Sequence, residues 1–425
     1  MKEHQDGAQQ QVIGEKKPSL STNTLFLGIV SFLTDVSSEM TVTLMPLFLA
    51  NVLRVSTAPI GIIEGVAEST ASITKLFSGW LSDKMGKRKP LTLLGYGLST
   101  FSKPFLYFAA SWWAVLFIRF SDRLGKGIRT APRDALIADS APEHLQGLNF
   151  GFHRAADTAG AFVGLGLATV IIYAMQGANL SFERATFQTL VLVGSVPALL
   201  AVIVIIFFVK DIKRSSGEAE APPRISFSGL DTRFKIFLAI SLIFTLGNSS
   251  DAFLVLRAQD LGLSVFHIAL LLLGFNFVYS ALATPAGALS DKLGRRKMLG
   301  VGWLIYALVY LGFATAGEAS YVWLLYIIYG VYYAMTEGVI KALISDIVPP
   351  AMRGTAYGAH STVVGVAALP ASIIAGLLWQ GAGPFQGFGA SAPFYFGAGL
   401  AMLSALLLLV WYPSRTWGLR PHPKG

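Results

Sequence analysis

Two pairs of carboxylates in this sequence are spaced four residues apart within apolar runs: Asp35 with Glu39, and Glu64 with Glu68. Side chains four apart lie on one face of an α-helix, so each pair would present two acids to the same neighbours. Asp35 and Glu39 lie near the middle of their run, and Glu68 lies near the middle of the next. A carboxylate at that depth is costly to keep charged and tends to take up a proton. The spacing predicts that Asp35, Glu39 and Glu68 bind protons reversibly.

A later run carries His153 and Asp157, which are also four apart and share a helix face. An imidazole beside a carboxylate suits proton transfer, so both residues join the proton-coupling candidates. Basic side chains in the same part of the chain are candidate contacts for a polar or anionic solute: Arg123, Lys126, Arg129 and Arg154. The second half of the chain supplies further candidate solute contacts: Asn248, Asp251, Asn276, Glu337 and Lys341. Glu337 and Lys341 are four apart, so they could satisfy each other locally.

Charged residues inside apolar runs are unevenly divided between the two halves of the chain. The first half places about sixteen ionisable side chains within its runs, and the second half about four. Charges that served only the fold would be needed equally in both halves. The excess therefore favours a functional site weighted towards the first half, although for each residue taken alone a structural ion pair stays an alternative.

Composition indicates what kind of element carries these charges. Of 425 residues, 53% are apolar and only 13% are charged, about half the charged fraction of an ordinary soluble domain. A soluble enzyme of this length would need more charge to cover its surface, which excludes that class. Cysteine is absent, which excludes disulfides, thiolate metal sites and thiol nucleophiles. The sequence contains no Walker-type phosphate-binding loop.

The apolar runs predict an all-α membrane protein with twelve transmembrane helices in two six-helix bundles. The runs cover 24–52, 58–82, 91–110, 112–140, 147–176, 186–209, 233–258, 264–290, 297–316, 320–347, 355–382 and 392–412. The first bundle spans 24–209 and the second spans 233–412, joined by a polar linker at 210–232. The polar tails are 1–23 and 413–425, and the first is not expected to hold a removable signal peptide, because it has no short apolar core that ends in a small-residue cleavage site.

Lysine and arginine concentrate in the tails, the linker and the loops on one side of the predicted bundle. Because cytoplasmic loops of membrane proteins carry this excess, both termini and the linker are expected in the cytoplasm. The net charge of +9 therefore indicates membrane orientation and not nucleic-acid binding. The many aromatic residues are assigned mostly to a lipid-facing belt.

Two loops repeat one motif at an offset of 208 residues. The stretch GWLSDKMGKRK begins at Gly79, and GALSDKLGRRK begins at Gly287. Matches around Asp139 and Asp346 keep nearly the same offset, so the chain is a tandem duplication of a six-helix unit. Parallel repeats of this kind bind substrate at mid-depth between the halves. The motif supplies the gate candidates: Gly79, Asp83, Gly86, Arg88, Gly287, Asp291, Gly294 and Arg296.

Both loops resemble the signature Gly-x-x-x-Asp-(Arg/Lys)-x-Gly-(Arg/Lys)-(Arg/Lys) of the major facilitator superfamily (MFS). The segments DVSSEM, DRLGKGIRTAPRDALIADSAP and GFHRAADTAG resemble a prokaryotic subfamily whose substrates are poorly defined. The resemblance implies two rocking halves, a gate role for Asp83 and Asp291, and a place in a prokaryotic inner membrane. Drug/proton antiporters of the superfamily carry a Gly-Pro pair in the fifth span, and this chain has none between Gly160 and Gly166.

These features predict a secondary active, proton-coupled transporter of a small polar or anionic solute, and not an enzyme. The proton gradient is its expected energy source, without a cofactor. Its expected partners are the lipid bilayer and the solute, with no nucleic acid, and it is expected to be a monomer. A carrier of a metal ion or metal chelate is the main alternative, with the metal unknown because no compact ligand motif occurs. A drug efflux antiporter is a further alternative.

Overall fold

The computed structural model describes residues 20–141, 145–212, 231–349 and 352–411. Nearly all of these residues are helical, apart from a small antiparallel pair of strands, β1 (Gly381–Ala382) and β2 (Phe385–Gln386). The predicted C-terminal tail, most of the predicted N-terminal tail and residues 213–230 of the predicted linker lie outside the described residues.

The helices of the first half follow the predicted apolar runs to within a few residues. They are α1 (Thr22–Thr41), α2 (Met45–Leu47), the π-helical turn η1 (Phe48–Val52), α3 (Thr57–Met85), α4 (Lys89–Ser102), the 3₁₀ turn η2 (Lys103–Phe108), α5 (Trp112–Ser140), α6 (Gln146–Gln176) and α7 (Arg184–Phe208). Local chemistry sets several of the ends. The Ser21 and Ser111 hydroxyls accept hydrogen bonds from backbone N–H groups in the first turns of α1 and α5. Gly86 ends α3 with a left-handed φ of 61°.

The helices of the second half follow the predicted runs equally closely. They are α8 (Thr232–Gly247), α9 (Ala252–Asp260), α10 (Val265–Leu293), α11 (Arg295–Thr315), α12 (Ala319–Ile347), α13 (Arg353–Gln380), α14 (Ala392–Leu406) and the π-helical turn η5 (Leu407–Trp411). Ser264 caps α10 by accepting a hydrogen bond from the backbone N–H of His267.

Nine of the described helical segments are long and apolar enough to cross a membrane. The other long segments are α3, α5 and α4 continued by η2, which complete a six-plus-six arrangement compatible with the predicted twelve spans. Helices α3 and α5 contain several of the charged residues singled out above, among them Glu64, Glu68, Arg123, Lys126 and Arg129. Their charge, rather than their length, separates them from the other spans.

The first and seventh spans are both interrupted at the same place in the repeat. Helix α1 ends at Thr41 and α2 begins at Met45, and helix α8 ends at Gly247 and α9 begins at Ala252. The two interruptions are about one repeat length apart. Discontinuous helices at mid-depth are typical of transporter binding sites, because irregular backbone in a membrane must line a cavity or be buried in protein.

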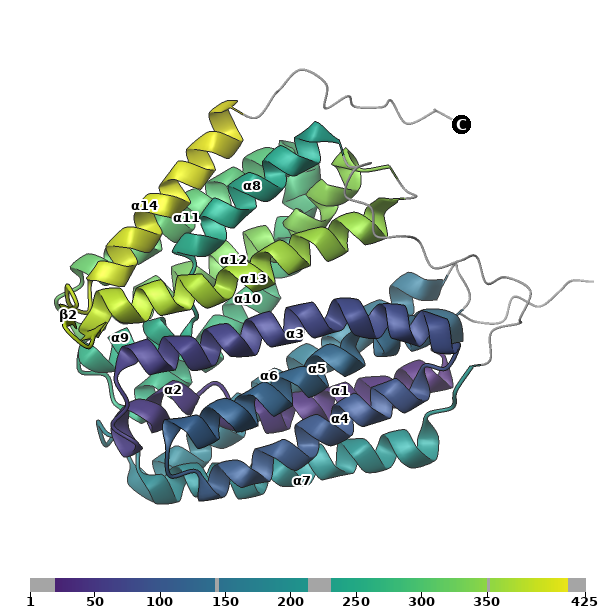
Figure 1. Ribbon diagram of the computed structural model, residues 1–425, viewed down its shortest axis with the longest axis horizontal. Helices are drawn as coiled ribbons and strands as arrows, with labels where there is room; N and C mark the ends of the chain where they lie inside the picture. The colour runs from purple at the N-terminus through teal and green to yellow at the C-terminus, as the bar shows by residue number, and fades with distance from the viewer. Residues whose placement is uncertain (1–19, 142–144, 213–230, 350–351, 412–425) are drawn as a thin grey trace, which may run out of the picture.

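The two halves lie side by side, and they approach each other more closely at one end than at the other (Figure 1). At the end that carries α2, α9 and β1, helices α3 and α13 touch through glycine. A side chain on Gly61 would collide with the backbone of Ser372, and one on Gly376 would collide with the backbone of Thr57 and Ala58. Towards Met85 and Arg353 the two helices diverge (Figure 1). We call the first end the sealed end and the second the open end.

A cluster of tyrosines forms part of the core of the second half, where a lipid-facing belt was expected. Tyr306, Tyr310, Tyr329 and Tyr332 from α11 and α12 are all at most 5% exposed. Their rings stack on one another, with centroids 4.1 Å apart for Tyr306 and Tyr310. The belt interpretation is therefore wrong for these residues, because their rings are buried against one another inside the bundle; the hydroxyls of Tyr306 and Tyr329 also donate to Asn248 and Asp251 there.

Candidate functional site

A cavity of about 570 Å³ lies between the two halves and is walled by both. The first half contributes five charged side chains to the wall: Glu39, Glu64, Glu68, Arg119 and Arg123. The second half contributes Asn248, Asp251, Asn276, Tyr333 and Glu337. Within the described part of the chain, the remaining predicted solute and proton candidates lie outside this wall: Asp35, Lys126, Arg129, His153, Arg154, Asp157 and Lys341.

Both helix interruptions open onto this cavity. Val42 and Thr43 line it from the first span, and the segment 248–251 lines it from the seventh. The cavity therefore lies where two spans depart from regular helix, which is the usual setting for a transported solute.

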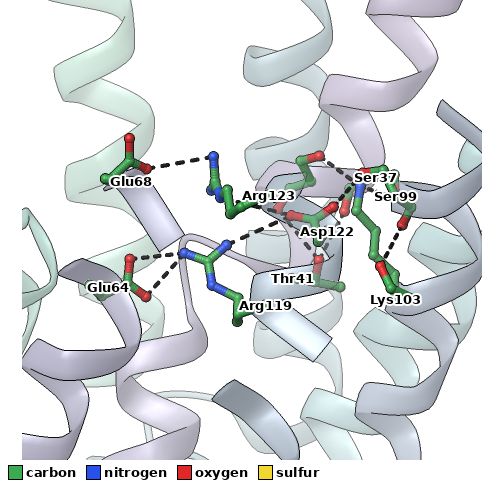
Figure 2. A network of polar contacts seen from close by, with 11 residues as sticks. Ser37, Thr41, Glu64, Glu68, Ser99, Lys103, Arg119, Asp122 and Arg123 are labelled. Atoms are coloured by element: carbon green, nitrogen blue, oxygen red, sulfur yellow. Dashed lines mark hydrogen bonds and ion pairs between the residues drawn. The ribbon is translucent and has the colours of Figure 1, made fainter. Parts of the chain in front are cut away.

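Two ion pairs form rungs between α3 and α5 on the first-half wall (Figure 2). Arg119 donates through Nη2 to both carboxylate oxygens of Glu64, at 2.8 and 3.1 Å. Arg123 Nη1 lies 3.6 Å from Glu68 Oε1. Each helix supplies two residues four apart, so the rungs lie one above the other on facing helix surfaces. The rungs differ in burial, because the Glu64 side chain is 9% exposed and the Glu68 side chain is 50% exposed.

Asp122 lies behind the two rungs and faces both arginines. Its Oδ2 is 3.9 Å from Arg119 Nη1 and 3.8 Å from Arg123 Nε, and its Oδ1 accepts a hydrogen bond from the Ser99 hydroxyl. Lys103 completes the group by donating to the Ser38 hydroxyl at 2.7 Å (Figure 2). Three acids and three bases share this network: Glu64, Glu68, Asp122, Lys103, Arg119 and Arg123. Their charges balance, which lowers the cost of burying them.

The proton candidates of α1 lie beside the cavity wall. Glu39 lines the cavity and accepts a hydrogen bond from the Thr43 hydroxyl at 2.6 Å. Asp35 is one helical turn away on α1, which packs tightly against α6: Gly160 and Gly164 of α6 meet the backbone of Phe32 and Val36. The structure therefore places Asp35 and Glu39 on a helix that packs directly against the helix of Asp157.

The remaining first-half candidates lie towards the open end. His153 Nδ1 is 3.7 Å from Asp157 Oδ2, as their spacing predicts. Arg154 donates to the Tyr279 hydroxyl at 2.9 Å and so joins α6 of the first half to α10 of the second. Arg129 turns away from the cavity and lies over the ring of Tyr96, 4.3 Å from its centroid.

The second-half candidates are held mainly by neutral groups. Asp251 accepts hydrogen bonds from the hydroxyls of Tyr329, at 2.6 Å, and Tyr333, at 3.1 Å. Asn248 accepts one from Tyr306 at 3.1 Å, and Asn276 donates to a carbonyl in its own helix. Glu337 and Lys341, which could pair by their spacing, are both exposed, and no ion pair joins them in the described structure.

The repeated loop motif forms an ion-pair cluster at the open end of each half. Arg88 contacts Asp83 at 2.6 Å and Asp139 at 3.2 Å. In the second half Arg295 contacts Asp291 at 3.2 Å and Asp346 at 2.7 Å. Arg88 corresponds to Arg296 in the repeat, but the arginine of the second cluster is the preceding residue, Arg295. Gly86 and Gly294 both adopt positive φ at the turn, which favours glycine there.

A smaller cleft of about 350 Å³ reaches the motif at the open end, between α3, α5 and α13. Gly79 and Asp83 line it from α3, and Gly354 and Gly358 line it from α13. The predicted gate loop of the first half therefore borders the gap between the halves. The gate role of these residues stays a prediction.

Sequence reasoning left several residues of the site out of its candidates. Arg119 and Asp122 are essential to the buried network, and Glu64 lines the cavity. The signal was present, because Arg119 and Arg123 repeat on α5 the four-residue spacing of Glu64 and Glu68 on α3. Tyr329 and Tyr333, the partners of Asp251, show the same spacing but are common residues in membrane helices. Within the described ranges, no group of three or more His, Asp or Glu side chains is arranged to hold a metal ion.

A sequence profile described as Major Facilitator Superfamily matches residues 27–256 and 236–424. The chain belongs to the Major Facilitator Superfamily. An uncharacterised MFS-type transporter of Methanocaldococcus jannaschii is 38% identical over 402 residues, which cover 93% of this chain and 96% of that protein. A multi-drug resistance efflux pump of Streptococcus pneumoniae is 27% identical over 331 residues, which cover 76% of this chain and 80% of the pump.

Solved structures of transporters share the fold. The crystal structure of a D-xylose–proton symporter superposes with a TM-score of 0.71 at 19% identity, covering 93% of this chain and 99% of the symporter. The predictions of an all-α membrane protein, of MFS membership and of a transport protein rather than an enzyme are thereby confirmed.

Proposed function

We propose that this protein is a secondary active transporter that carries a small polar solute by alternating access and couples its movement to protons. The observation that carries the proposal is the central cavity, which lies between two repeats that touch at one end and separate at the other. A rocking motion of the halves would close the open end and open the sealed end around the same cavity.

Direct hydrogen bonds between the halves support a sealed state at one end. Asn51 and Gln259 exchange two amide hydrogen bonds, of 2.8 and 2.7 Å. The backbone N–H of Thr57 donates to Gln380 at 2.7 Å, and its hydroxyl donates to the carbonyl of Gly376 at 3.0 Å. A solute could not pass this end without breaking them.

Exposed charges support access from the other end. Lys75, Lys126, Glu337 and Lys341 are all exposed, although each lies inside a long helix. Charged side chains inside membrane spans normally face a water-filled space. With the orientation predicted from lysine and arginine, this space would open to the cytoplasm of a prokaryotic cell, and the conformation would be inward-facing.

The acids near the cavity support proton coupling. Glu39 and Glu68 line the cavity, Asp35 is one helical turn from Glu39, and Asp157 is on α6, which packs against α1. An acid that is reached from either side in turn can exchange its proton between the two compartments. The similarity to a multi-drug resistance efflux pump makes export of a drug-like solute the second candidate function.

Reconstituted liposomes with an internal pH dye test the proposal. Solutes are first chosen by their ability to stabilise the purified protein against heat, and each is then added outside to look for coupled proton movement. The matched control is the double variant Asn51→Cys with Gln259→Cys, in which a short cross-linker that a reductant can cleave joins the two thiols. The unmodified chain has no cysteine, so no other site reacts. We expect solute-dependent proton movement that stops on cross-linking and returns on reduction. Solutes that bind but never move protons or cross the membrane would contradict the proposal.

A further inference from the structure

We propose that the second-half wall of the central cavity binds the cationic group of the solute, an organic ammonium, with Asp251 as its counter-ion. This inference names the substrate class of the transport site and rests on the proposed function for the movement of that solute. It departs from the anionic solute that the basic residues of the fourth and fifth spans suggested.

The charge of the cavity wall argues against an anion. Five carboxylates and only two guanidinium groups line it: Glu39, Glu64, Glu68, Asp251, Glu337, Arg119 and Arg123. The two arginines already face Glu64 and Glu68, and Asp122 lies behind both. The wall therefore has an excess of negative charge outside the rungs. An anionic solute would meet that excess, and a cationic solute would relieve it.

Among the cavity carboxylates that are not paired with an arginine, Asp251 has the surroundings that best suit a cation. Its carboxylate is held by two neutral donors, the hydroxyls of Tyr329 and Tyr333. No Lys, Arg or His among the described residues forms an ion pair with it. Asp251 also occupies the N-cap position of the nine-residue helix α9, where the helix dipole favours a negative charge. The charge of Asp251 is thus stabilised locally but is not matched by a protein cation.

Aromatic rings stand beside this carboxylate on the cavity wall. Phe275 and Tyr333 both line the cavity, and their ring centroids are 5.2 Å apart in an edge-to-face arrangement. Phe275 also stacks on Tyr329, at 5.5 Å. A carboxylate next to aromatic faces is the usual recognition site for ammonium groups, which gain both an ion pair and cation–π attraction. A cavity of about 570 Å³ has the size of an ordinary small-molecule site.

Binding of a matched set of probes to the purified protein in detergent tests this inference. Benzyltrimethylammonium is a permanent cation, benzyl alcohol is neutral, and phenylacetate is an anion of similar size. Thermal unfolding and calorimetry are measured at one pH for each probe. We expect the cation to stabilise the protein and to bind at least tenfold more tightly than the other two. Equal binding of all three, or a preference for phenylacetate, would overturn the assignment.

Variants locate the cation. Asp251→Asn should weaken benzyltrimethylammonium binding at least tenfold, and Tyr333→Phe should weaken it less while keeping the aromatic face. The matched control is Glu318→Gln, which removes one exposed acid from the same half, away from the cavity. The site would be overturned if both Tyr333→Phe and a folded Asp251→Asn bound benzyltrimethylammonium as tightly as the unmodified protein. Should Asp251→Asn fail to fold, Tyr333→Phe and the probe ranking of the unmodified protein decide.

This experiment and the liposome experiment fail in different ways. Selective cation binding that depends on Asp251, without proton movement or transport, would keep the site and overturn the proposed function. Coupled transport of solutes without any preference for a cation would keep the proposed function and overturn the site.

Discussion

The two charge rungs between α3 and α5 show how the same pair of residue types takes different roles. Glu64 and Arg119 are both buried and share two hydrogen bonds, so removing either one takes away the nearest charge partner of the other. Glu68 is half exposed to the cavity and lies 3.6 Å from Arg123, which leaves it able to exchange partners. We therefore expect Glu64 to hold the helices together and Glu68 to take part in transport.

Substituting the two acids separates these roles. Glu64→Gln should destabilise the protein by about 3–5 kcal/mol, because it leaves buried Arg119 with only the more distant Asp122, at 3.9 Å, as a charge partner. Glu68→Gln should cost about 0–1 kcal/mol, the usual value for an exposed pair, and should impair transport instead. Thermal unfolding and uptake by reconstituted protein measure both effects. The double variant Glu64→Leu with Arg119→Leu serves as a control and should recover stability, whereas equal destabilisation by the two Gln variants would refute the distinction.

Neutral replacements of the α1 acids test proton coupling. Asp35→Asn and Glu39→Gln keep the shape of each side chain but cannot bind and release a proton. Both should abolish accumulation driven by a pH gradient and keep solute exchange, since the cavity wall is otherwise intact. Uptake into liposomes with and without an imposed gradient measures this. If both variants still concentrate solute in response to the gradient, the coupling site lies elsewhere, with Glu68 and Asp157 next to be tested.

The helices were predictable from the sequence because long apolar runs leave little choice of structure, and α6 begins and ends within a residue of its predicted run. The interruption after Thr41 was not predictable, since Val42, Thr43 and Leu44 are no more polar than their neighbours. The candidate site was predictable only in part. Asp251 stood out as a charge within an apolar run, but its tyrosine partners come from α12 and depend on how that helix is rotated. Pairings of this kind follow from packing, and periodicity alone does not give them.

The ion-pair cluster at the end of α3 predicts a specific effect on the gate. Asp83→Asn removes one partner of Arg88, but Asp139 stays within 3.2 Å and keeps the arginine paired. The variant should therefore fold and reach the membrane normally, and it should slow transport several-fold because closure of the open end loses a charge. Uptake rates normalised to folded protein measure this. The control is Asp260→Asn, which alters an ion pair with Arg257 at the sealed end; wild-type turnover in folded Asp83→Asn would refute the gate role.

At the scale of the whole molecule, the sealed end is held by a pair of amide side chains that occupy equivalent positions in the two repeats. Asn51 and Gln259 are 208 residues apart, the same offset as the two loop motifs, and they exchange hydrogen bonds across the contact between the halves. Equivalent positions of the two repeats therefore meet at this contact. Under the proposed alternating access, this contact would open as a unit, because both bonds cross the same boundary.

Removing one partner of this pair should shift the protein towards the opposite conformation. Asn51→Ala loses two hydrogen bonds between the halves, worth about 1–3 kcal/mol together, which corresponds to a population shift of roughly 5- to 150-fold. A cysteine placed at Thr43 in the cavity should then react faster with a membrane-impermeant maleimide from the sealed side. Gln188→Ala, which removes an amide bonded within the first half only, should leave the rate unchanged. An unaltered labelling rate in Asn51→Ala would show that the pair does not hold the seal.

Spin-label distances across both ends test alternating access most directly, and the cysteine-free chain allows labels to be placed without background. One pair replaces Lys84 and Arg353 at the open end, and the other replaces Arg54 and Ala382 at the sealed end. Distances are measured in lipid nanodiscs at about pH 5 and about pH 9, which bracket the titration of partly buried acids. Alternating access predicts opposite changes at the two ends. At the pH at which the labels of the open end move closer together, the labels of the sealed end move further apart. Distances that stay fixed at both ends, or that lengthen and shorten together, would contradict it.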